Sequence, residues 1–257
     1  MNDKIQVLID NEKCTGCGLC VADCLRKDLE IQNKKAVPLN KSCFMCGHCL
    51  AICPAKAVKL EGLDDEIREL PAGPVFLDEK SLKTHLKFRR SVRHFKDVPV
   101  EKEKIEKIIE AGRLTPTASN LQNVRYIIVQ YKINEIEDAV LLQYRNPVGF
   151  TVTYTYSADR LKRGFLFHKA PVVVLVISPS EINACLAAMN MELMAEALGL
   201  GVVYVGLFTR PANVNKELRA SLGVAEGENI AACLALGYSD AEYLRSAPRK
   251  KAEVKWM

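Results

Sequence analysis

The chain has 257 residues, a net charge of +5, 49% hydrophobic residues and 26% charged residues. This balance is typical of a folded globular protein and excludes a disordered chain, and the length allows one large domain or two unequal ones. The longest apolar stretch, Ala197–Phe208, is shorter than the about 20 residues that a membrane span needs. The first eleven residues carry Asp3 and Asp10 and no apolar core, so we do not expect them to act as a secretory signal. We therefore expect a cytoplasmic protein with no membrane partner.

Cysteine is the unusual residue of this sequence, because eight of the 10 cysteines lie between Cys14 and Cys53. In a reducing cytoplasm such a cluster indicates metal binding and not disulfides. The eight form two runs of the pattern C-x2-C-x2-C-x3-C, in which Cys14, Cys17, Cys20 and Cys24 recur at the same spacing as Cys43, Cys46, Cys49 and Cys53. We interpret residues 1–60 as a duplicated metal-binding unit that is too small to bury much core without its metal.

These cysteines could bind iron–sulfur clusters or zinc. Three closely spaced thiolates can bind three corners of an iron–sulfur cubane, and the fourth corner then needs a thiolate from further away. Zinc sites usually pair two C-x2-C units, a pattern that duplicated triplets fit poorly. The spacing therefore favours iron–sulfur. Residues 1–60 hold nine Lys and Arg against six Asp and Glu, an excess of 9 − 6 = +3 that would balance anionic clusters. No nucleic-acid reader motif is present, so we expect no nucleic-acid partner.

Over residues 1–60 the two runs resemble bacterial two-cluster ferredoxins, in which the fourth cysteine of each run binds the other cluster. The resemblance implies two [4Fe–4S] clusters and low-potential one-electron transfer. It assigns the first cluster to Cys14, Cys17, Cys20 and Cys53, and the second to Cys43, Cys46, Cys49 and Cys24. Leu25 departs from the proline that often follows the first run.

The chain after the cysteines mixes helix and strand signals. An acidic stretch and Pro71-Ala-Gly-Pro predict a linker over 61–77, followed by a second domain over 78–257. Residues 181–198 are apolar on nearly every face, which predicts a buried helix, in the core or in a subunit interface. Cys185 and Cys233 are expected to be buried core thiols. Other helices are expected at 81–88 and 100–114, strands at 124–130, 171–177, 202–207 and 230–236, and a long excursion at 134–169.

Three polar segments of the second domain have the chemistry of a phosphate and heterocycle site. Arg-Arg-Ser-Val-Arg at 89–93 offers guanidinium forks and a hydroxyl for phosphate. The loop Thr-Pro-Thr-Ala-Ser-Asn-Leu-Gln at 115–122 carries hydroxyls and amides that can bond the edge of a heterocycle. Gly206 follows a predicted strand, where backbone can approach a flat ring. Each segment alone is a common surface feature.

Their order, followed by Glu-Ala-Leu-Gly-Leu-Gly at 196–201 and Leu-Gly-Tyr at 236–238, resembles the FMN-dependent nitroreductase family from about Lys83 to the C-terminus. The resemblance implies an α+β sandwich with a central sheet flanked by helices, and an intertwined homodimer with FMN at the interface. The FMN contacts that it implies are Arg89, Arg90, Ser91, Arg93, Thr117, Ala118, Ser119, Asn120, Gln122, Val205, Gly206, Leu207, Arg249 and Lys250. Val205 stands where some members carry glutamate, so a polar side-chain role there is not expected.

Together the two resemblances predict an iron–sulfur flavoprotein oxidoreductase. Two [4Fe–4S] clusters would pass electrons to FMN, which would reduce a small electron-poor acceptor such as a nitroaromatic or a quinone. The electron donor is unknown: a ferredoxin, a nicotinamide nucleotide or another reductase. Two alternatives stay open. The protein is an electron-transfer module that feeds a protein partner, or the same scaffold carries out ene reduction or dehalogenation.

Overall fold

The computed structural model describes residues 6–257 except 64, 72–76, 148–155 and 158, so parts of the predicted linker and of the predicted excursion lie outside the described residues. The chain divides into two units. The N-terminal unit comprises Met1–Val75 and Ala118–Leu121, and the C-terminal unit comprises Phe76–Thr117 and Gln122–Met257. Each unit is described by itself below.

The N-terminal unit repeats one small motif twice. Helix α1 (Leu19–Asp23) follows Gly18 and helix α2 (His48–Ala51) follows Gly47, two glycines at equivalent positions of the repeat that both have φ near +80°. A left-handed residue is least costly as glycine, so both helices begin in the same way. Strands β1 (Gln6–Ile9) and β4 (Val58–Glu61) pair antiparallel, as do β2 (Leu29–Gln32) and β3 (Lys35–Pro38). The buried core is small and includes Cys14, Cys20 and Cys49, as expected for a unit that needs metal to be stable.

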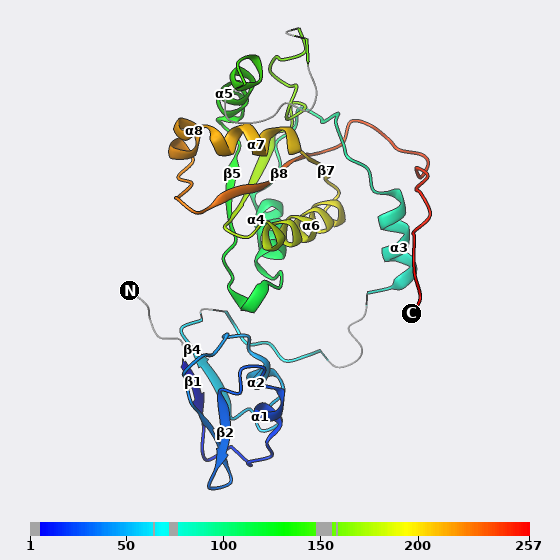
Figure 1. Cartoon of the computed structure of the whole chain (residues 1–257). Coiled ribbons are helices and arrows are strands. Elements are labelled where there is room, and N and C mark those ends of the chain that lie inside the picture. Colours follow the sequence, from blue (N-terminus) through cyan, green and yellow to red (C-terminus); the bar gives the residue numbers. More distant parts are fainter. Residues whose placement is uncertain (1–5, 64, 72–76, 148–155, 158) are drawn as a thin grey trace. The chain divides into compact units, whose positions relative to one another are not determined.

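The C-terminal unit is built on a four-stranded antiparallel sheet in the order β5-β6-β8-β7. Figure 1 labels β5, β8 and β7 of this sheet. Its strands are β5 (Arg125–Val129), β6 (Val172–Ser178), β7 (Gly201–Tyr204) and β8 (Asn229–Gly237). All seven residues of β6 are buried, because helices cover both faces of the sheet at this strand. The helices are α3 (Glu79–Phe88), α4 (Lys102–Arg113), α5 (Ile133–Arg145), α6 (Glu181–Ala197), α7 (Gly206–Val214) and α8 (Lys216–Ser221).

Alternation along β6 separates the two hydrophobic layers. Val173, Leu175 and Ile177 pack in the core that also contains residues of α5, α7 and α8. Val172, Val174 and Val176 point to the opposite face and pack in the core with α4 and α6. This division follows from the two-residue period of a strand. The predicted α+β sandwich with a central sheet flanked by helices is confirmed.

Some local predictions differ from the structure. The expected strand 202–207 ends at Tyr204, and Gly206 and Leu207 begin helix α7. Helices α5, α7 and α8 were not predicted. Cys233 is buried as expected, but Cys185 is exposed, because it lies on the outer side of α6 with Ile182 and Leu186. An apolar helix is thus only partly covered in the single chain.

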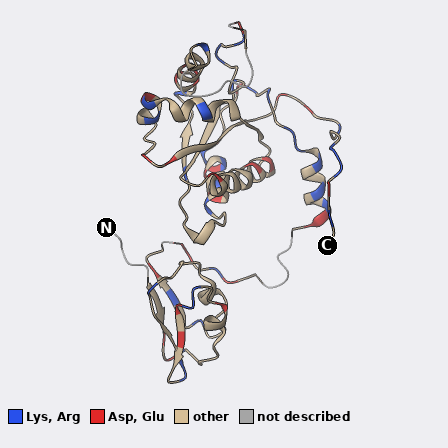
Figure 2. Ribbon diagram, in the orientation of Figure 1, with Lys and Arg blue, Asp and Glu red and all other residues tan. Residues whose placement is uncertain are grey.

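Acidic and basic residues are mixed along helices α3, α4, α5 and α8 of the C-terminal unit (Figure 2). Helix α4, for example, carries Glu103 in its first turn and Arg113 in its last. Charges placed in this way interact favourably with the helix dipole and stabilise the helix. Among the described residues, no helix is both long enough and apolar enough to cross a membrane.

Candidate functional site

The eight cysteines of the two runs line two separate small cavities of the N-terminal unit. Cys14, Cys17, Cys20 and Cys53 line one of them, together with the glycines of the first run. Cys24, Cys43, Cys46 and Cys49 line the other. The fold thus brings the fourth cysteine of each run to the first three of the other run. This is the grouping that the crossed ligand assignment requires, and the assignment itself stays a prediction.

Backbone amides donate hydrogen bonds to the sulfur atoms at equivalent positions of the repeat. The amide of Asp28 donates to Cys24 Sγ at 3.3 Å, and the amide of Ala57, its counterpart in the second half of the repeat, donates to Cys53 Sγ at 3.3 Å. Amide donors of this kind stabilise thiolates that bind iron and contribute to setting the potential of a cluster. The donor set is eight cysteines, and backbone amides donate to the sulfurs of Cys14, Cys24, Cys43 and Cys53. This set fits two iron–sulfur clusters.

Burial opposes thiolate formation at Cys49 in the absence of metal. It raises the pKa of the Cys49 thiol to about 11, and the negative charges of Cys43 and Cys46 add to the effect. Burial raises the pKa of Cys20 as well, with a further contribution from Cys53. Metal binding must therefore displace protons from these thiols and is expected to weaken at low pH.

The predicted arginine segment lies along the edge strand of the C-terminal sheet. The amide of Val92 donates to the carbonyl of Val202 at 3.0 Å, and Ser91 forms a parallel bridge to Val202. Gly201 permits this approach, because a Cβ at that position would lie 2.5 Å from Val92 Cγ2. The sheet therefore fixes the backbone of residues 91–92 beside β7.

Arg89 and Arg90 have different surroundings. Arg89 Nη1 donates to Glu192 Oε1 of α6 at 2.8 Å, and the Glu192 side chain is only 2% exposed. Arg90 Nη1 donates to the carbonyl of Arg89, while Arg90 Nη2 is buried and has no hydrogen-bond partner. A buried guanidinium nitrogen without an acceptor is costly, and an anion such as a phosphate would satisfy it. Arg93 Nη1 lies 3.5 Å from the carbonyl of Ser91.

Helix α6 carries two carboxylates that the sequence analysis did not assign. Besides Glu192, it presents Glu196, whose Oε2 lies 2.8 Å from His85 Nε2 of α3. The pKa of Glu196 is raised to about 7: burial is the largest cause, the charge of Glu192 also raises this pKa, and Arg89 lowers it. Glu192 and Glu196, two acidic residues in the last two turns of a mainly apolar helix, were the signal that could have revealed this cluster.

The loop at 115–122 is anchored at both sides by asparagines of α6. Asn190 Nδ2 donates to Thr115 Oγ1 at 2.7 Å, and Asn183 Nδ2 donates to Asn123 Oδ1 at 2.9 Å. The amide of Gln122 donates to Thr117 Oγ1 at 2.9 Å. Residues 118–120 form a short 3₁₀ turn, in which Ala118 and Ser119 are exposed and the Asn120 side chain is directed to the N-terminal unit's own backbone.

The segment 205–207 connects β7 to α7. Val205 is buried, and the position of a Cβ on Gly206 has no atom within 4 Å, so the backbone of Gly206 faces open space. Tyr144 of α5 donates its hydroxyl to the carbonyl of Leu207 at 2.7 Å and packs edge-on against Tyr156, which contacts Phe165. These aromatic residues lie in the predicted excursion, and the sequence analysis did not single them out.

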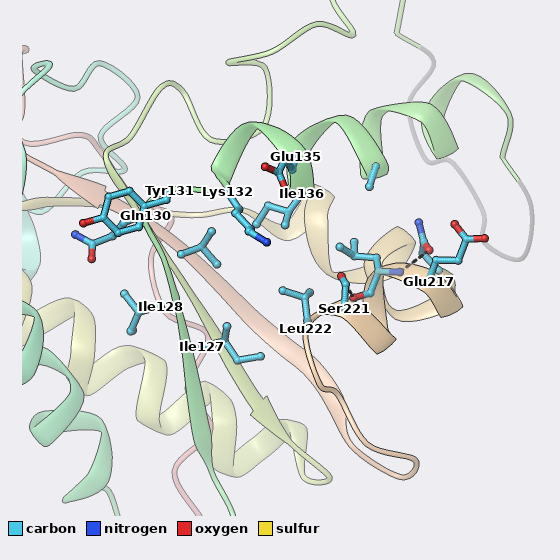
Figure 3. Close-up of a pocket in the computed structure, with 14 residues that line it drawn as sticks. Ile127, Ile128, Gln130, Tyr131, Lys132, Glu135, Ile136, Glu217, Ser221 and Leu222 are labelled. Carbon is cyan, nitrogen blue, oxygen red and sulfur yellow. Dashed lines mark hydrogen bonds between the residues drawn. The ribbon is translucent and has the colours of Figure 1, made fainter.

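Arg249 and Lys250 lie exposed in the C-terminal stretch, which has no helix or strand after β8. A groove of about 570 Å³ lies elsewhere, between β5, α5 and α8, and its walls include Ile127, Ile136 and Leu222 (Figure 3). None of the predicted site residues lines this groove.

Comparison with known proteins identifies both parts of the chain. Residues 86–238 match the model of the Nitroreductase family, and residues 6–54 match that of the 4Fe-4S dicluster domain. The first match covers more than half of the chain. The protein therefore belongs to the nitroreductase family, and a 4Fe–4S dicluster domain precedes its family domain.

Individual relatives resemble one part or the other. A protein of Archaeoglobus fulgidus that carries the name NADH dehydrogenase/NAD(P)H nitroreductase is 29% identical over 153 residues, which are 58% of this chain and 80% of that protein. Ferredoxin-2 of Desulfomicrobium norvegicum is 53% identical over 32 residues, 12% of this chain and 54% of that protein. A nitroreductase of Bacteroides fragilis, solved with bound FMN, shares the fold at a TM-score of 0.60 and 22% identity, covering 70% of this chain and 100% of that one.

Proposed function

We propose that the protein is an iron–sulfur flavoprotein oxidoreductase that uses FMN and two [4Fe–4S] clusters to reduce a small electron-poor acceptor, such as a nitroaromatic or a quinone. The observation that carries this proposal is the presence of two four-cysteine cavities in one chain with a nitroreductase-family domain. When bound, the clusters would supply electrons singly and FMN would deliver them in pairs to the acceptor.

The residues beside β7 fit the phosphate end of FMN. The buried Arg90 Nη2 lacks an acceptor, and the neighbouring Ser91 and Arg93 offer further donors. Gly206, whose backbone faces open space, would allow the ring to approach at the end of the same strand. Arg89 contributes positive charge while its pairing with Glu192 holds the segment in place. The remaining FMN contacts are carried over from the family resemblance: Thr117, Ala118, Ser119, Asn120, Gln122, Val205, Leu207, Arg249 and Lys250.

We propose further that two copies of the chain form a homodimer. Ile182 on the outer side of α6 is 73% exposed and Leu186 is 47% exposed, so an apolar strip of this helix is open in the single chain. Burying such a strip against another copy would be favourable, in keeping with the predicted homodimer. The electron donor stays unassigned.

The proposed activity is tested by anaerobic reoxidation. The loaded protein, reduced with dithionite and freed of excess reductant, is mixed with a nitroaromatic, a quinone, an enone or a halogenated aromatic. We expect the nitroaromatic or the quinone to reoxidise the protein and to accept about four electrons per chain, two from the clusters and two from FMN. Reoxidation by the enone or the halogenated aromatic alone would move the reaction to ene reduction or dehalogenation. Reoxidation only by an added electron-carrier protein would support the electron-transfer module instead.

A further inference from the structure

The two cysteine cavities of the N-terminal unit differ in the charge of the residues that line them. Charged residues at three positions line the second cavity: Arg26, Asp28 and His48. Neutral residues occupy the corresponding positions of the repeat and line the first cavity: Ala55, Ala57 and Leu19. The repeat thus preserves the cysteines of both cavities and places charged side chains beside the second set.

Asp28 is the buried residue of this charged group. It is 4% exposed, whereas Arg26 and His48 are exposed. His48 Nδ1 also lies 3.2 Å from Asp23 Oδ2, and this carboxylate offsets positive charge on the ring. Water and salt screen the charge of an exposed side chain much more than that of a buried one. The negative charge of Asp28 therefore dominates the electrostatic difference between the two cavities.

The two carboxylate oxygens of Asp28 have different surroundings. Oδ1 accepts hydrogen bonds from the amides of Lys41 at 2.9 Å and Ser42 at 3.3 Å, and so holds the segment that leads to Cys43. Oδ2 is buried and has no hydrogen-bond partner among the described residues. Burying a carboxylate oxygen without a donor costs stability. An asparagine would supply the same acceptor without a buried charge, so the need to hold this segment does not account for an aspartate.

Hydrogen bonds to sulfur are similar in the two cavities. In the described part of the chain, two backbone amides donate to sulfur in each cavity, at 3.2–3.4 Å. The donors are Ala36 and Ala57 in the first cavity, and Met45 and Asp28 in the second. Hydrogen bonds to sulfur and nearby charge both set the potential of a cluster. The amides give no reason for the two clusters to differ in potential, and the buried carboxylate gives one.

We propose that the Asp28 carboxylate lowers the reduction potential of the second cluster and makes it the lower of the two cluster potentials. Reduction adds one negative charge to a cluster, and a negative charge held beside it in a buried position opposes that addition. A low-potential one-electron donor therefore reduces the first cluster and then, with a second electron, the second cluster. Each step oxidises the donor by one electron and forms or breaks no covalent bond. This inference rests on the iron–sulfur part of the proposed function.

The test is a redox titration of the loaded full-length chain, followed by low-temperature electron paramagnetic resonance of the reduced clusters. Asp28→Asn keeps an acceptor for the two amides and removes the charge. We expect reduction of the second cluster to become about tenfold more favourable, a rise of about 59 mV for a one-electron couple. Glu30→Gln removes the same charge from a less buried position on β2. We expect it to change this equilibrium less than about twofold, because solvent screens the charge.

Cys14→Ser identifies the second cluster, because it removes a ligand of the first cavity and leaves the second set of cysteines complete. With Asp28 intact, the remaining cluster should have the lower of the two potentials of the unaltered protein, a result that does not depend on the stability of Asp28→Asn. A remaining cluster with the higher potential would overturn the inference. Unchanged potentials in Asp28→Asn, or an equal shift in Glu30→Gln, would overturn it as well and leave the proposed function intact. Absence of iron–sulfur signals from the unaltered protein would overturn both.

Discussion

Replacing Cys53 with serine is expected to remove the cluster of the first cavity and to spare the cluster of the second, although Cys53 belongs to the second run. Cys53 lines the same cavity as Cys14, Cys17 and Cys20. Serine is a much poorer iron ligand than a thiolate, so the variant should lose about four of eight irons. Iron analysis and electron paramagnetic resonance of the reduced protein measure the loss. The spectrum of Cys14→Ser, which removes a ligand of the first cluster under either assignment, identifies which cluster remains.

Cys24→Ser is the matched variant, because Cys24 and Cys53 occupy equivalent positions of the repeat and accept equivalent amide hydrogen bonds. It should lose the other cluster. Cys185→Ser, at an exposed cysteine outside both cavities, should retain the full iron content. Loss of the second cluster alone in Cys53→Ser would show that each run binds its own cluster and that the crossed assignment is wrong.

Arg89→Ala is expected to destabilise the C-terminal unit by about 3–5 kcal/mol, the usual effect of leaving one partner of a buried ion pair without its counterion. Glu192 is 2% exposed in its side chain and would lose the bond from Arg89 Nη1. Native-state hydrogen exchange of the fully buried amides of β6 reports this change without interference from the other unit. The double variant Arg89→Ala/Glu192→Gln should recover part of the loss, since it no longer buries a free charge.

Arg90→Ala is compared with Arg89→Ala to separate an effect on FMN binding from an effect on the stability of the unit. Arg90 makes no ion pair in the described structure and its buried Nη2 lacks an acceptor, so its loss should change the stability of the flavin-free protein little. A charged hydrogen bond to phosphate contributes about 1.5–3 kcal/mol, so FMN affinity should fall about 10-fold to 100-fold. Fluorescence titration with FMN measures the affinity. Unchanged FMN affinity in Arg90→Ala would remove this residue from the phosphate site, and unchanged β6 exchange in Arg89→Ala would show that the ion pair does not stabilise the unit.

The sequence was most informative for the cysteine runs, because iron–sulfur binding depends on a characteristic spacing of cysteines. The cysteine runs predicted two sets of four sulfurs, and the fold places these sets around two cavities. The order of the polar segments likewise predicted the sandwich. Ile136, Val140 and Leu141 of α5 have helical spacing in the sequence, although no helix was predicted within residues 134–169.

Contacts between residues that are distant in the chain could not be predicted from the sequence. Arg89 and Glu192 are separated by 103 residues, and Asn120 and Met45 by 75. Neither pair belongs to a local pattern, so only the placement of α6 beside Arg89 and the placement of the 118–121 turn reveal them. The same holds for Tyr144, whose bond to Leu207 links two helices that the sequence analysis had not predicted.

The central claim is that one chain holds two iron–sulfur clusters and a flavin. The most direct measurement is the iron, acid-labile sulfide and flavin content of the anaerobically purified protein, together with its optical spectrum. We predict about eight irons, about eight sulfides and about one FMN per chain. Zinc in place of iron, or eight irons with no capacity to bind FMN, would contradict the claim.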